Sequence, residues 1–321
     1  MRVTDRRRLG RSAVELTVLG FGGSQVGNLH EPVSDEDAAQ AVAAAWALGI
    51  RYFDTAPLYA QGLGERRMGR ALRGHRRDGY VLSTKVGRLV EPHGVAFDYS
   101  HDGVLRSIED SLRRLDVARI DVALVHDIDP YTHGPDQPRR FREAMEGAYP
   151  ALDRLRREGV LGAIGVGVNS WHVCQNAVET ADFDCVLLAG RYTLLEQAPL
   201  ASFLPLCERR GIGLIVGAPY NSGILARGTV DGARYNDAAP PREIAQRATA
   251  LAAVCARHRV SLGAAALQFP LAHPAVASVL PGPRTAAHVE AGVRWLGETI
   301  PGDFWRELKA LRLLETGAPT P

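Results

Sequence analysis

The sequence predicts an α/β fold of the (β/α)8 TIM-barrel class, formed as a single domain by residues 1–321. Short apolar runs alternate with amphipathic helical patterns along the whole chain, and no linker interrupts them. Strands that are apolar on both faces and separated by helices are typical of a parallel sheet. Eight such units in a chain of this length match the barrel in number and size. The expected strands are 16–20, 51–55, 80–85, 120–125, 163–168, 184–189, 213–217 and 277–280.

The helices expected between these strands begin after recognisable capping residues. Ser34 precedes the helical pattern 35–48, and Ser100 precedes the pattern 101–115. A serine at this position caps a helix because its oxygen accepts a hydrogen bond from a backbone N–H. Five more helical patterns cover 138–157, 171–181, 200–210, 242–258 and 286–296.

A doubly wound sheet with a second domain is the alternative architecture. It would need a glycine-rich turn of the GxGxxG type directly after the first strand. Gly20, Gly22 and Gly23 have a different spacing, and 28–32 does not look like the start of a helix. The barrel is therefore the preferred prediction.

Composition argues against several function classes. The chain has 38 Lys and Arg against 36 Asp and Glu, with one short basic block at 6–8, so a nucleic acid is not an expected partner. Its four cysteines form no CxxC pair, which argues against a zinc site or a disulfide framework. Glu15 interrupts any leader-like apolar run, and the apolar stretch 261–282 contains Gln268 and Pro270, so neither a secretory leader nor a membrane span is expected. A cytoplasmic location is expected.

Polar side chains follow the second, third and fourth predicted strands, at the end where barrels of this kind carry their active sites. Asp54 lies at the end of the second strand and Tyr59 in the loop after it. Lys85 ends the third strand, and His126 follows the fourth. Lys85 is one of only two lysines among the 38 basic residues, and an ammonium at the end of an apolar strand needs an anionic partner. Asp54 is the expected partner.

Together these four side chains have the chemistry of a proton-transfer site. A free tyrosine has a pKa of about 10, and a nearby Lys85 ammonium is expected to lower the pKa of Tyr59 by favouring the phenolate. His126 is expected to hydrogen-bond the substrate oxygen opposite Tyr59. No serine or cysteine nucleophile stands beside His126 and no set of metal ligands is recognisable, so no metal is expected.

Four motifs resemble those of the aldo-keto reductase family, in the same order along the chain. They are FDTAPLY at 53–59, STKVG at 83–87, LVHD at 124–127 and GVGVN at 165–169. The resemblance extends from LGFGG near the start to LPGPRT near the end. It implies a (β/α)8 barrel, a nicotinamide cofactor and a catalytic tetrad, whose roles fall on Asp54, Tyr59, Lys85 and His126.

The same resemblance implies which residues bind the cofactor. Asn169 matches an asparagine that holds the nicotinamide carboxamide, and Gly217 stands where a stacking tyrosine is usual. Gly282 and His288 stand where basic residues usually hold the 2′-phosphate of NADP, which leaves Arg284 as the nearest certain cation. The expected cofactor is therefore NAD, or NAD and NADP both. The remaining cofactor-binding residues expected from the resemblance are Gly22, Gly23, Pro219, Tyr220, Leu225 and Pro281.

The segments 191–197 and 217–225 resemble the branch of the family that oxidises sugars at C1. The expected function is NAD(P)-dependent oxidation of an aldose of the L-fucose, L-galactose or D-arabinose type to its lactone. Oxidation of pyridoxal and general reduction of aldehydes or ketones, with the same tetrad, are alternatives. A non-catalytic subunit that binds the cofactor is an alternative of another class.

Two long loops, 127–138 and 221–241, follow the fourth and seventh predicted strands and should lie at the same end of the barrel as the tetrad. They carry the candidate substrate residues Asp127, His133, Tyr235 and Asn236. Their side chains suit a small sugar or aldehyde with hydrogen-bonding groups. The sequence predicts no oligomeric state.

Overall fold

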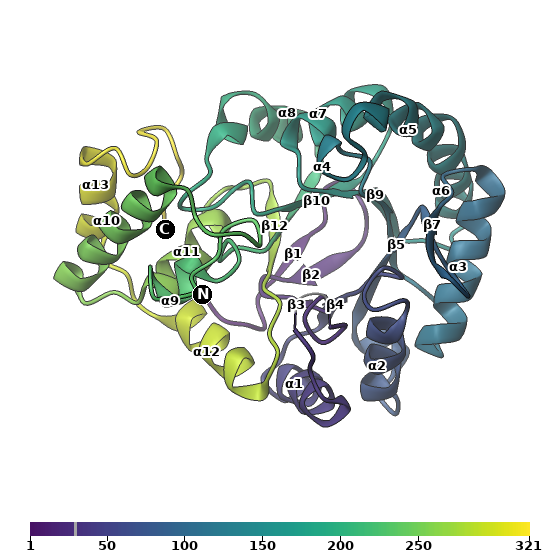
Figure 1. Cartoon of the computed structure of the whole chain (residues 1–321), viewed down its shortest axis with the longest axis horizontal. Helices are drawn as coiled ribbons and strands as arrows, with labels where there is room; N and C mark the ends of the chain where they lie inside the picture. Colours follow the sequence, from purple (N-terminus) through teal and green to yellow (C-terminus); the bar gives the residue numbers. More distant parts are fainter. Residues whose placement is uncertain (29–30) are drawn as a thin grey trace.

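The structure is a computed structural model that describes residues 1–28 and 31–321, and it contains an eight-stranded parallel barrel surrounded by helices (Figure 1). Val279 donates a hydrogen bond to Val18 and accepts one from Gly20, and these contacts join the last strand to the residues just before the first. The predicted fold class is therefore confirmed. In barrel order the strands are β3 (Phe21–Gly22), β4 (Tyr52–Asp54), β5 (Val81–Val86), β8 (Val122–His126), β9 (Ala163–Val168), β10 (Cys185–Ala189), β11 (Gly213–Gly217) and β12 (Val276–Leu280).

The first barrel strand differs from the prediction of 16–20. Residues Glu15–Thr17 form β2, which pairs antiparallel with β1 (Arg6–Arg8) in a hairpin outside the barrel. Leu9 and Leu16 are buried against the side chains inside the barrel, so this hairpin covers one end of it. The apolar run continues without a break from the hairpin into the barrel strand, and apolar patterning alone therefore could not separate the two.

The helices form a layer around the strands, and the predicted caps of two of them are present. Ser34 Oγ accepts a hydrogen bond from Asp37 N at 3.0 Å, and Ser100 Oγ accepts one from Gly103 N at 3.1 Å. The larger helices are α1 (Asp35–Ala47), α2 (Leu63–Leu72), α3 (His101–Leu115), α5 (Gln137–Glu143), α6 (Tyr149–Arg157), α7 (Trp171–Thr180), α8 (Phe203–Arg210), α10 (Arg242–His258), α11 (Leu262–Leu271), α12 (Ala286–Gly297) and α13 (Gly302–Ala310).

Three of these helices, α2, α11 and α13, were not predicted. Helix α2 contains Gly69, where an added Cβ would lie 2.0 Å from Leu115 O, so this glycine lets α2 pack closely on α3. Helix α11 is buried from Gly263 to Leu271, and a helix that is apolar on every side has no amphipathic pattern to detect. No helix in the described part of the chain is long and apolar enough to cross a membrane.

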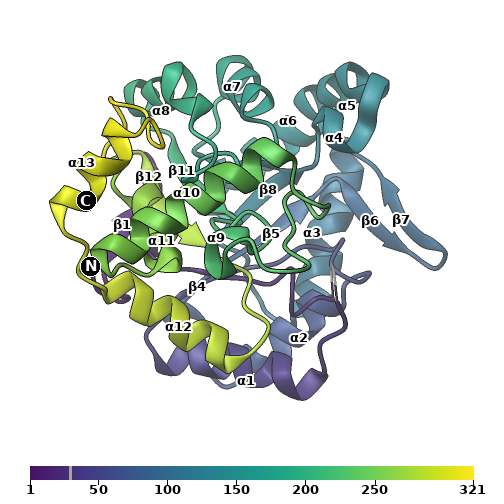
Figure 2. The same ribbon diagram turned by 60° about the vertical axis from the view of Figure 1, so that its left-hand side comes forward.

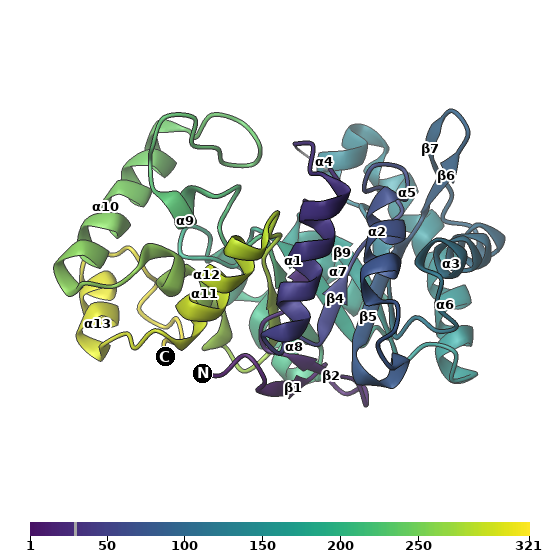
Figure 3. The same cartoon turned by 90° about the horizontal axis from the view of Figure 1, so that it is seen from below.

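The loops at one end of the barrel contain further structure. Strand β5 is followed by a hairpin of β6 (Arg88–Glu91) and β7 (Gly94–Phe97), and the two long loops contain α4 (Pro130–His133) and α9 (Ile224–Arg227). Figure 3 shows β6 and β7 at the opposite end of the molecule from β1 and β2. Helices α1 and α12, from opposite ends of the chain, pack side by side (Figure 2). The end that carries β6 and β7 is the one where the C-terminal ends of the barrel strands meet.

Candidate active site

Two neighbouring strands bring Asp54 and Lys85 into a buried ion pair. Lys85 Nζ donates to Asp54 Oδ1 at 2.6 Å and to Thr55 O at 2.9 Å. Ser83 Oγ donates to the other carboxylate oxygen of Asp54, also at 2.6 Å. Both charged residues are only 2% exposed. The pairing expected from the sequence is present, and Ser83 holds the carboxylate from the second side.

Tyr59 lies next to this pair, and its pKa differs from the sequence-based prediction. Lys85 Nζ is 5.2 Å from the centroid of the Tyr59 ring. Burial raises the pKa of Tyr59, and the Lys85 ammonium lowers it by a smaller amount, so the net pKa is above the ordinary value. The predicted lowering was wrong because desolvation of the phenolate outweighs the attraction of the cation. The pKa of Lys85 is raised: burial lowers it, but Asp54 and Tyr59 together raise it more, so this side chain stays an ammonium.

His126 faces Tyr59 edge-on, with ring centroids 6.4 Å apart and ring planes at 88°. Burial and the nearby cations Lys85 and Arg88 lower the pKa of His126 well below its ordinary value. The imidazole is therefore neutral at physiological pH. Its Nδ1 atom is buried and has no hydrogen-bond partner among the described residues. A neutral imidazole next to a phenol can hydrogen-bond the oxygen on which the proton transfer occurs.

Asp127 follows His126 and is joined to Arg88 at the start of β6. Arg88 Nη2 lies 2.6 Å from Asp127 Oδ2, and the same oxygen lies 3.4 Å from His126 Nε2. Asp127 has a backbone φ of +52°, a left-handed conformation that few non-glycine residues adopt. A charged pair thus stands directly beside the imidazole.

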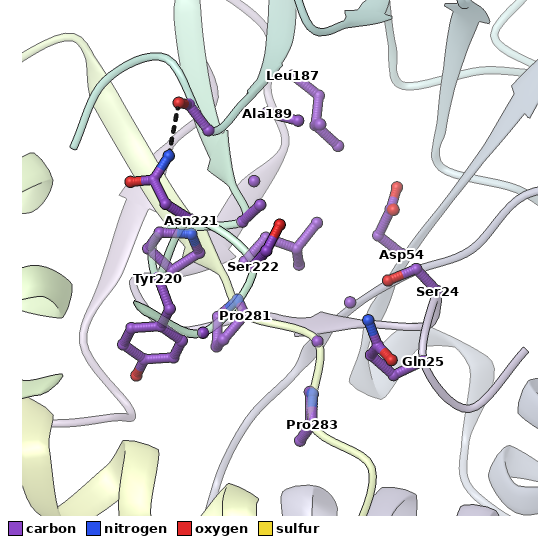
Figure 4. A pocket seen from close by; sticks show the side chains of 18 of the residues that line it. Ser24, Gln25, Asp54, Leu187, Ala189, Tyr220, Asn221, Ser222, Pro281 and Pro283 are labelled. Atoms are coloured by element: carbon purple, nitrogen blue, oxygen red, sulfur yellow. Dashed lines mark hydrogen bonds between the residues drawn. The ribbon is translucent and has the colours of Figure 1, made fainter. Parts of the chain in front are cut away.

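A cavity of about 760 Å³ contains these residues, a volume within the range of small-molecule and cofactor sites. Figure 4 shows Ser24, Gln25 and Asp54 on one side of it and Tyr220 and Asn221 on the other. The predicted site residues that line the cavity are Gly22, Asp54, Tyr59, Lys85, His126, Asp127, Asn169, Gly217, Pro219, Tyr220, Asn236, Pro281, Gly282, Arg284 and His288.

Four other predicted residues are outside the lining of this cavity, as far as the chain is described. Gly23 donates its backbone N–H to Asp54 O at 2.7 Å, and Leu225 is fully buried. His133 Nε2 lies 3.1 Å from the Tyr99 hydroxyl, and the Tyr235 hydroxyl donates to Glu196. The two candidate substrate residues His133 and Tyr235 therefore have partners within the protein.

The cavity wall near the first and last strands has features of a ligand site. A Cβ atom at Gly22 would lie 2.9 Å from Pro281 O, so only glycine leaves space between the first and last strands. Asn221 Nδ2 donates to Gly190 O at 3.0 Å, whereas Asn221 Oδ1 is buried without a partner among the described residues (Figure 4). Asn221 and Ser222 both have positive φ angles, of 44° and 56°. Strained backbone and an unpaired acceptor at a cavity wall are typical of a ligand site.

The basic residues near the last strand are partly neutralised. Arg284 forms an ion pair with Glu31, and its Nε donates to Gln25 Oε1 at 3.2 Å. Burial and the charges of Arg284 and Arg227 lower the pKa of His288, so this histidine is uncharged at physiological pH. Arg227 also lines the cavity.

Several lining residues were not proposed from the sequence as site residues. Ser24 and Gln25 directly follow the glycines after the first strand, and Arg88 lies three residues after Lys85. Their positions just beyond strand ends are a signal that could have identified them. Arg191, which donates to Asn236 Oδ1 at 2.9 Å, gives no such signal because the loop fold brings the two together.

Comparison with known proteins gives the family. Residues 18–312 match the aldo/keto reductase family. The chain belongs to this family. This aldo/keto reductase is 38% identical to pyridoxal 4-dehydrogenase from Microbacterium luteolum, over 98% of this chain and 99% of that protein. It is 37% identical to D-threo-aldose 1-dehydrogenase from a Pseudomonas species, over 95% of this chain and 97% of that protein.

Among solved structures, it is similar to an aldo-keto reductase from Bacillus halodurans in its holo form. The TM-score is 0.80, with 26% identity and 98% of each chain covered. The aldo/keto reductase described here is therefore a nicotinamide-dependent oxidoreductase that acts on CH–OH groups. The geometry of the tetrad residues agrees with that chemistry.

Proposed function

We propose that this aldo/keto reductase oxidises the cyclic hemiacetal of an aldose at C1 to a lactone, with NAD as the electron acceptor. The observation that carries the proposal is the arrangement of Tyr59, Lys85 and His126 in one cavity, with Lys85 held by a buried carboxylate. This arrangement suits proton transfer between a side chain and the substrate, and it needs no side chain that attacks the substrate as a nucleophile. The names of the two relatives agree in substrate chemistry, because an aldose and pyridoxal each carry an aldehyde that can close on a hydroxyl to a hemiacetal.

In the proposed reaction, Tyr59 accepts the proton of the anomeric hydroxyl as C1 loses a hydride. A bound nicotinamide dinucleotide supplies the acceptor for that hydride. Lys85 stabilises the phenolate form of Tyr59, and Asp54 keeps the ammonium in place. The neutral His126 binds the same substrate oxygen and orients it toward Tyr59.

The cofactor would be held by the wall that contains Gly22, Asn169, Gly217, Asn221 and Pro281. Asn169 is anchored through its backbone, because its N–H donates to Asp129 Oδ2 at 2.7 Å and its carbonyl accepts from Arg191 Nε at 3.1 Å. The choice of NAD is supported by the absence of a side chain at Gly282, by the neutral His288 and by the pairing of Arg284 with Glu31.

Pyridoxal is the second candidate substrate, because the relative whose name carries that activity is 38% identical over 98% of the chain. Both candidates would use the same tetrad. They differ in what surrounds the hemiacetal. Pyridoxal has an aromatic ring there, whereas an aldose has a chain of hydroxyl-bearing carbons.

The test is a comparison of NADH formation with L-fucose, D-arabinose, L-galactose and pyridoxal at alkaline pH, with Tyr59→Phe as the inactive control. Sugar oxidation with accumulation of a lactone supports the proposal. A larger kcat/KM for the reduction of aromatic aldehydes than for every sugar would overturn the dehydrogenase function and leave the family unaffected.

A further inference from the structure

The ion pair of Arg88 and Asp127 is part of the cavity wall beside the reacting side chains. Their side chains are 15% and 9% exposed, and the two charged groups are 2.6 Å apart. Both residues line the cavity that contains the tetrad. The pair is therefore largely shielded from water and has access to the substrate space.

The pair is held in place from two sides. The Arg88 guanidinium lies over the Phe97 ring of the same hairpin, 4.6 Å from the ring centroid. Asp127 donates its backbone N–H to Gly167 O at 3.1 Å, and its left-handed backbone orients the carboxylate. Left-handed backbone at a non-glycine residue is strained and persists where the surrounding structure imposes it. Both groups are thus positioned before a substrate arrives.

The hydrogen bonds of the pair are incomplete. Arg88 Nε is buried and has no hydrogen-bond partner in the described part of the chain. A buried donor without a partner is uncommon and costs stability, so the guanidinium has hydrogen-bonding capacity that the protein leaves unused. The positive and negative charges cancel, so the pair suits a neutral ligand and not a phosphate or a carboxylate. A hydroxyl group matches it, because a hydroxyl accepts from a guanidinium and donates to a carboxylate.

The position of the pair indicates which hydroxyl it would bind. Asp127 Oδ2 lies 3.4 Å from His126 Nε2, and His126 holds the reacting oxygen in the proposed function on which this step rests. We propose that Arg88 and Asp127 bind the hydroxyl on the carbon next to the reacting carbon, and that they select substrates with such a vicinal hydroxyl. Arg88 is then a specificity-determining residue of this enzyme.

The competing explanation is that the pair only fastens the β6–β7 hairpin to the barrel. Substrate pairs that differ in one hydroxyl distinguish the two. D-arabinose and 2-deoxy-D-ribose form such a pair for oxidation with NAD, since the second is the first without its 2-hydroxyl. Glyceraldehyde and 3-hydroxypropanal form a pair for reduction with NADH, which is independent of sugar oxidation.

The variants are Arg88→Met and Asp127→Asn, and Arg140→Met is the matched control. Arg140 also packs against Phe97, at 5.8 Å, and also has a buried Nε without a partner among the described residues, but it is not part of the cavity lining. Thermal unfolding and the Kd of NADH for each variant test whether the fold and the cofactor site are intact.

For each pair of substrates that the wild type turns over, we expect kcat/KM to be about 10- to 100-fold higher for the member with the hydroxyl. This is the size of effect expected for a hydrogen bond to a charged group. Arg88→Met should lower that ratio to within about threefold of one, by slowing the hydroxylated substrate more than the deoxy one, and Arg140→Met should keep the ratio. Equal losses for both members, or no preference in the wild type, would overturn the proposal. A preference for glyceraldehyde that disappears in Arg88→Met, without oxidation of any sugar, would support this inference and refute the proposed sugar oxidation.

Discussion

At the scale of single residues, the proton on Tyr59 is controlled by two opposing influences. Burial raises the pKa of this phenol, and the ammonium of Lys85 lowers it by less. The site therefore holds a protonated Tyr59 at neutral pH, the form that would act as the acid in reduction. Oxidation needs the phenolate, so its rate depends on how far pH or the bound ligands favour loss of this proton.

Replacement of Tyr59 by phenylalanine should lower kcat by at least about a hundredfold, because general acid–base catalysis contributes this much or more. The Kd of NADH should stay close to the wild-type value, since only the hydroxyl is removed. Steady-state kinetics together with a fluorescence titration of NADH would check both expectations. Near-normal turnover of Tyr59→Phe would refute the role given to Tyr59.

The pH dependence should have opposite signs in the two directions of the reaction. Because the pKa of Tyr59 is raised, the phenolate fraction increases as pH rises above neutrality, and kcat for oxidation should increase with it. The rate of aldehyde reduction should fall over the same range, since it needs the protonated phenol. A lowered pKa of His126 adds no further transition there, because the imidazole is already neutral. Rate profiles that rise in both directions would contradict this account.

Replacement of Lys85 by methionine should affect stability as well as catalysis. It leaves the Asp54 carboxylate buried without its cation, and loss of one partner of a buried pair costs about 3–5 kcal/mol in the free energy of unfolding. The pH profile of the remaining oxidation activity should shift to higher pH, because the phenolate of Tyr59 loses its nearest positive charge. Addition of Asp54→Asn should restore part of the stability and none of the activity. Denaturant unfolding of the single and double variants would measure the first effect, and an unchanged pH profile would exclude the role given to Lys85.

At the scale of the elements, local signals placed the ends of two helices correctly, whereas the single helix predicted over 138–157 is divided into α5, a π-helical segment (Ala144–Ala148) and α6. Helix α3 begins after Ser100 and covers His101–Leu115 as expected, and α10 covers Arg242–His258 as expected. Where an element is buried on all sides, as α11 is, the amphipathic pattern disappears and the sequence offered no boundary. The reason is that a cap is a contact within one turn of helix, whereas the environment of a buried helix is set by distant segments.

Replacement of Ser100 by alanine should therefore reduce the free energy of unfolding by about 1 kcal/mol, through loss of the hydrogen bond from Gly103 N. The cap lies outside the cavity, so kcat/KM should not change. Ser100→Thr keeps the capping oxygen and serves as the control. A fall in kcat/KM without a loss of stability would contradict a purely structural role for this serine.

At the scale of the whole molecule, the barrel brings the two ends of the chain together at the cavity proposed to hold the cofactor. Glu31, after the first strand, pairs with Arg284, after the last. Gly22 in the first strand likewise lies against Pro281, which directly follows the last strand. Such contacts join residues more than two hundred positions apart, so the proposed cofactor site depends on closure of the barrel.

This pairing leads to a prediction about the cofactor. The affinity for NADP should not exceed the affinity for NAD by more than about tenfold, because Arg284 is already neutralised by Glu31. Glu31→Gln should release Arg284 and tighten NADP binding, with little change for NAD. Fluorescence titrations of both cofactors with both proteins would measure this. Wild-type protein that binds NADP more than about tenfold tighter than NAD, equivalent to about 1.4 kcal/mol, would contradict it.

The alternation of apolar runs and helices was enough to predict the barrel, and the positions of Asp54, Lys85 and His126 relative to strand ends were enough to propose that they meet. These features depend on a few neighbouring residues and on the parallel order of the strands. The pKa of Tyr59, the Arg88–Asp127 pair and the internal partners of His133 and Tyr235 depended on the tertiary structure. Desolvation and ion pairing depend on which distant side chains exclude water from a group, and no pattern within a single segment contains that information.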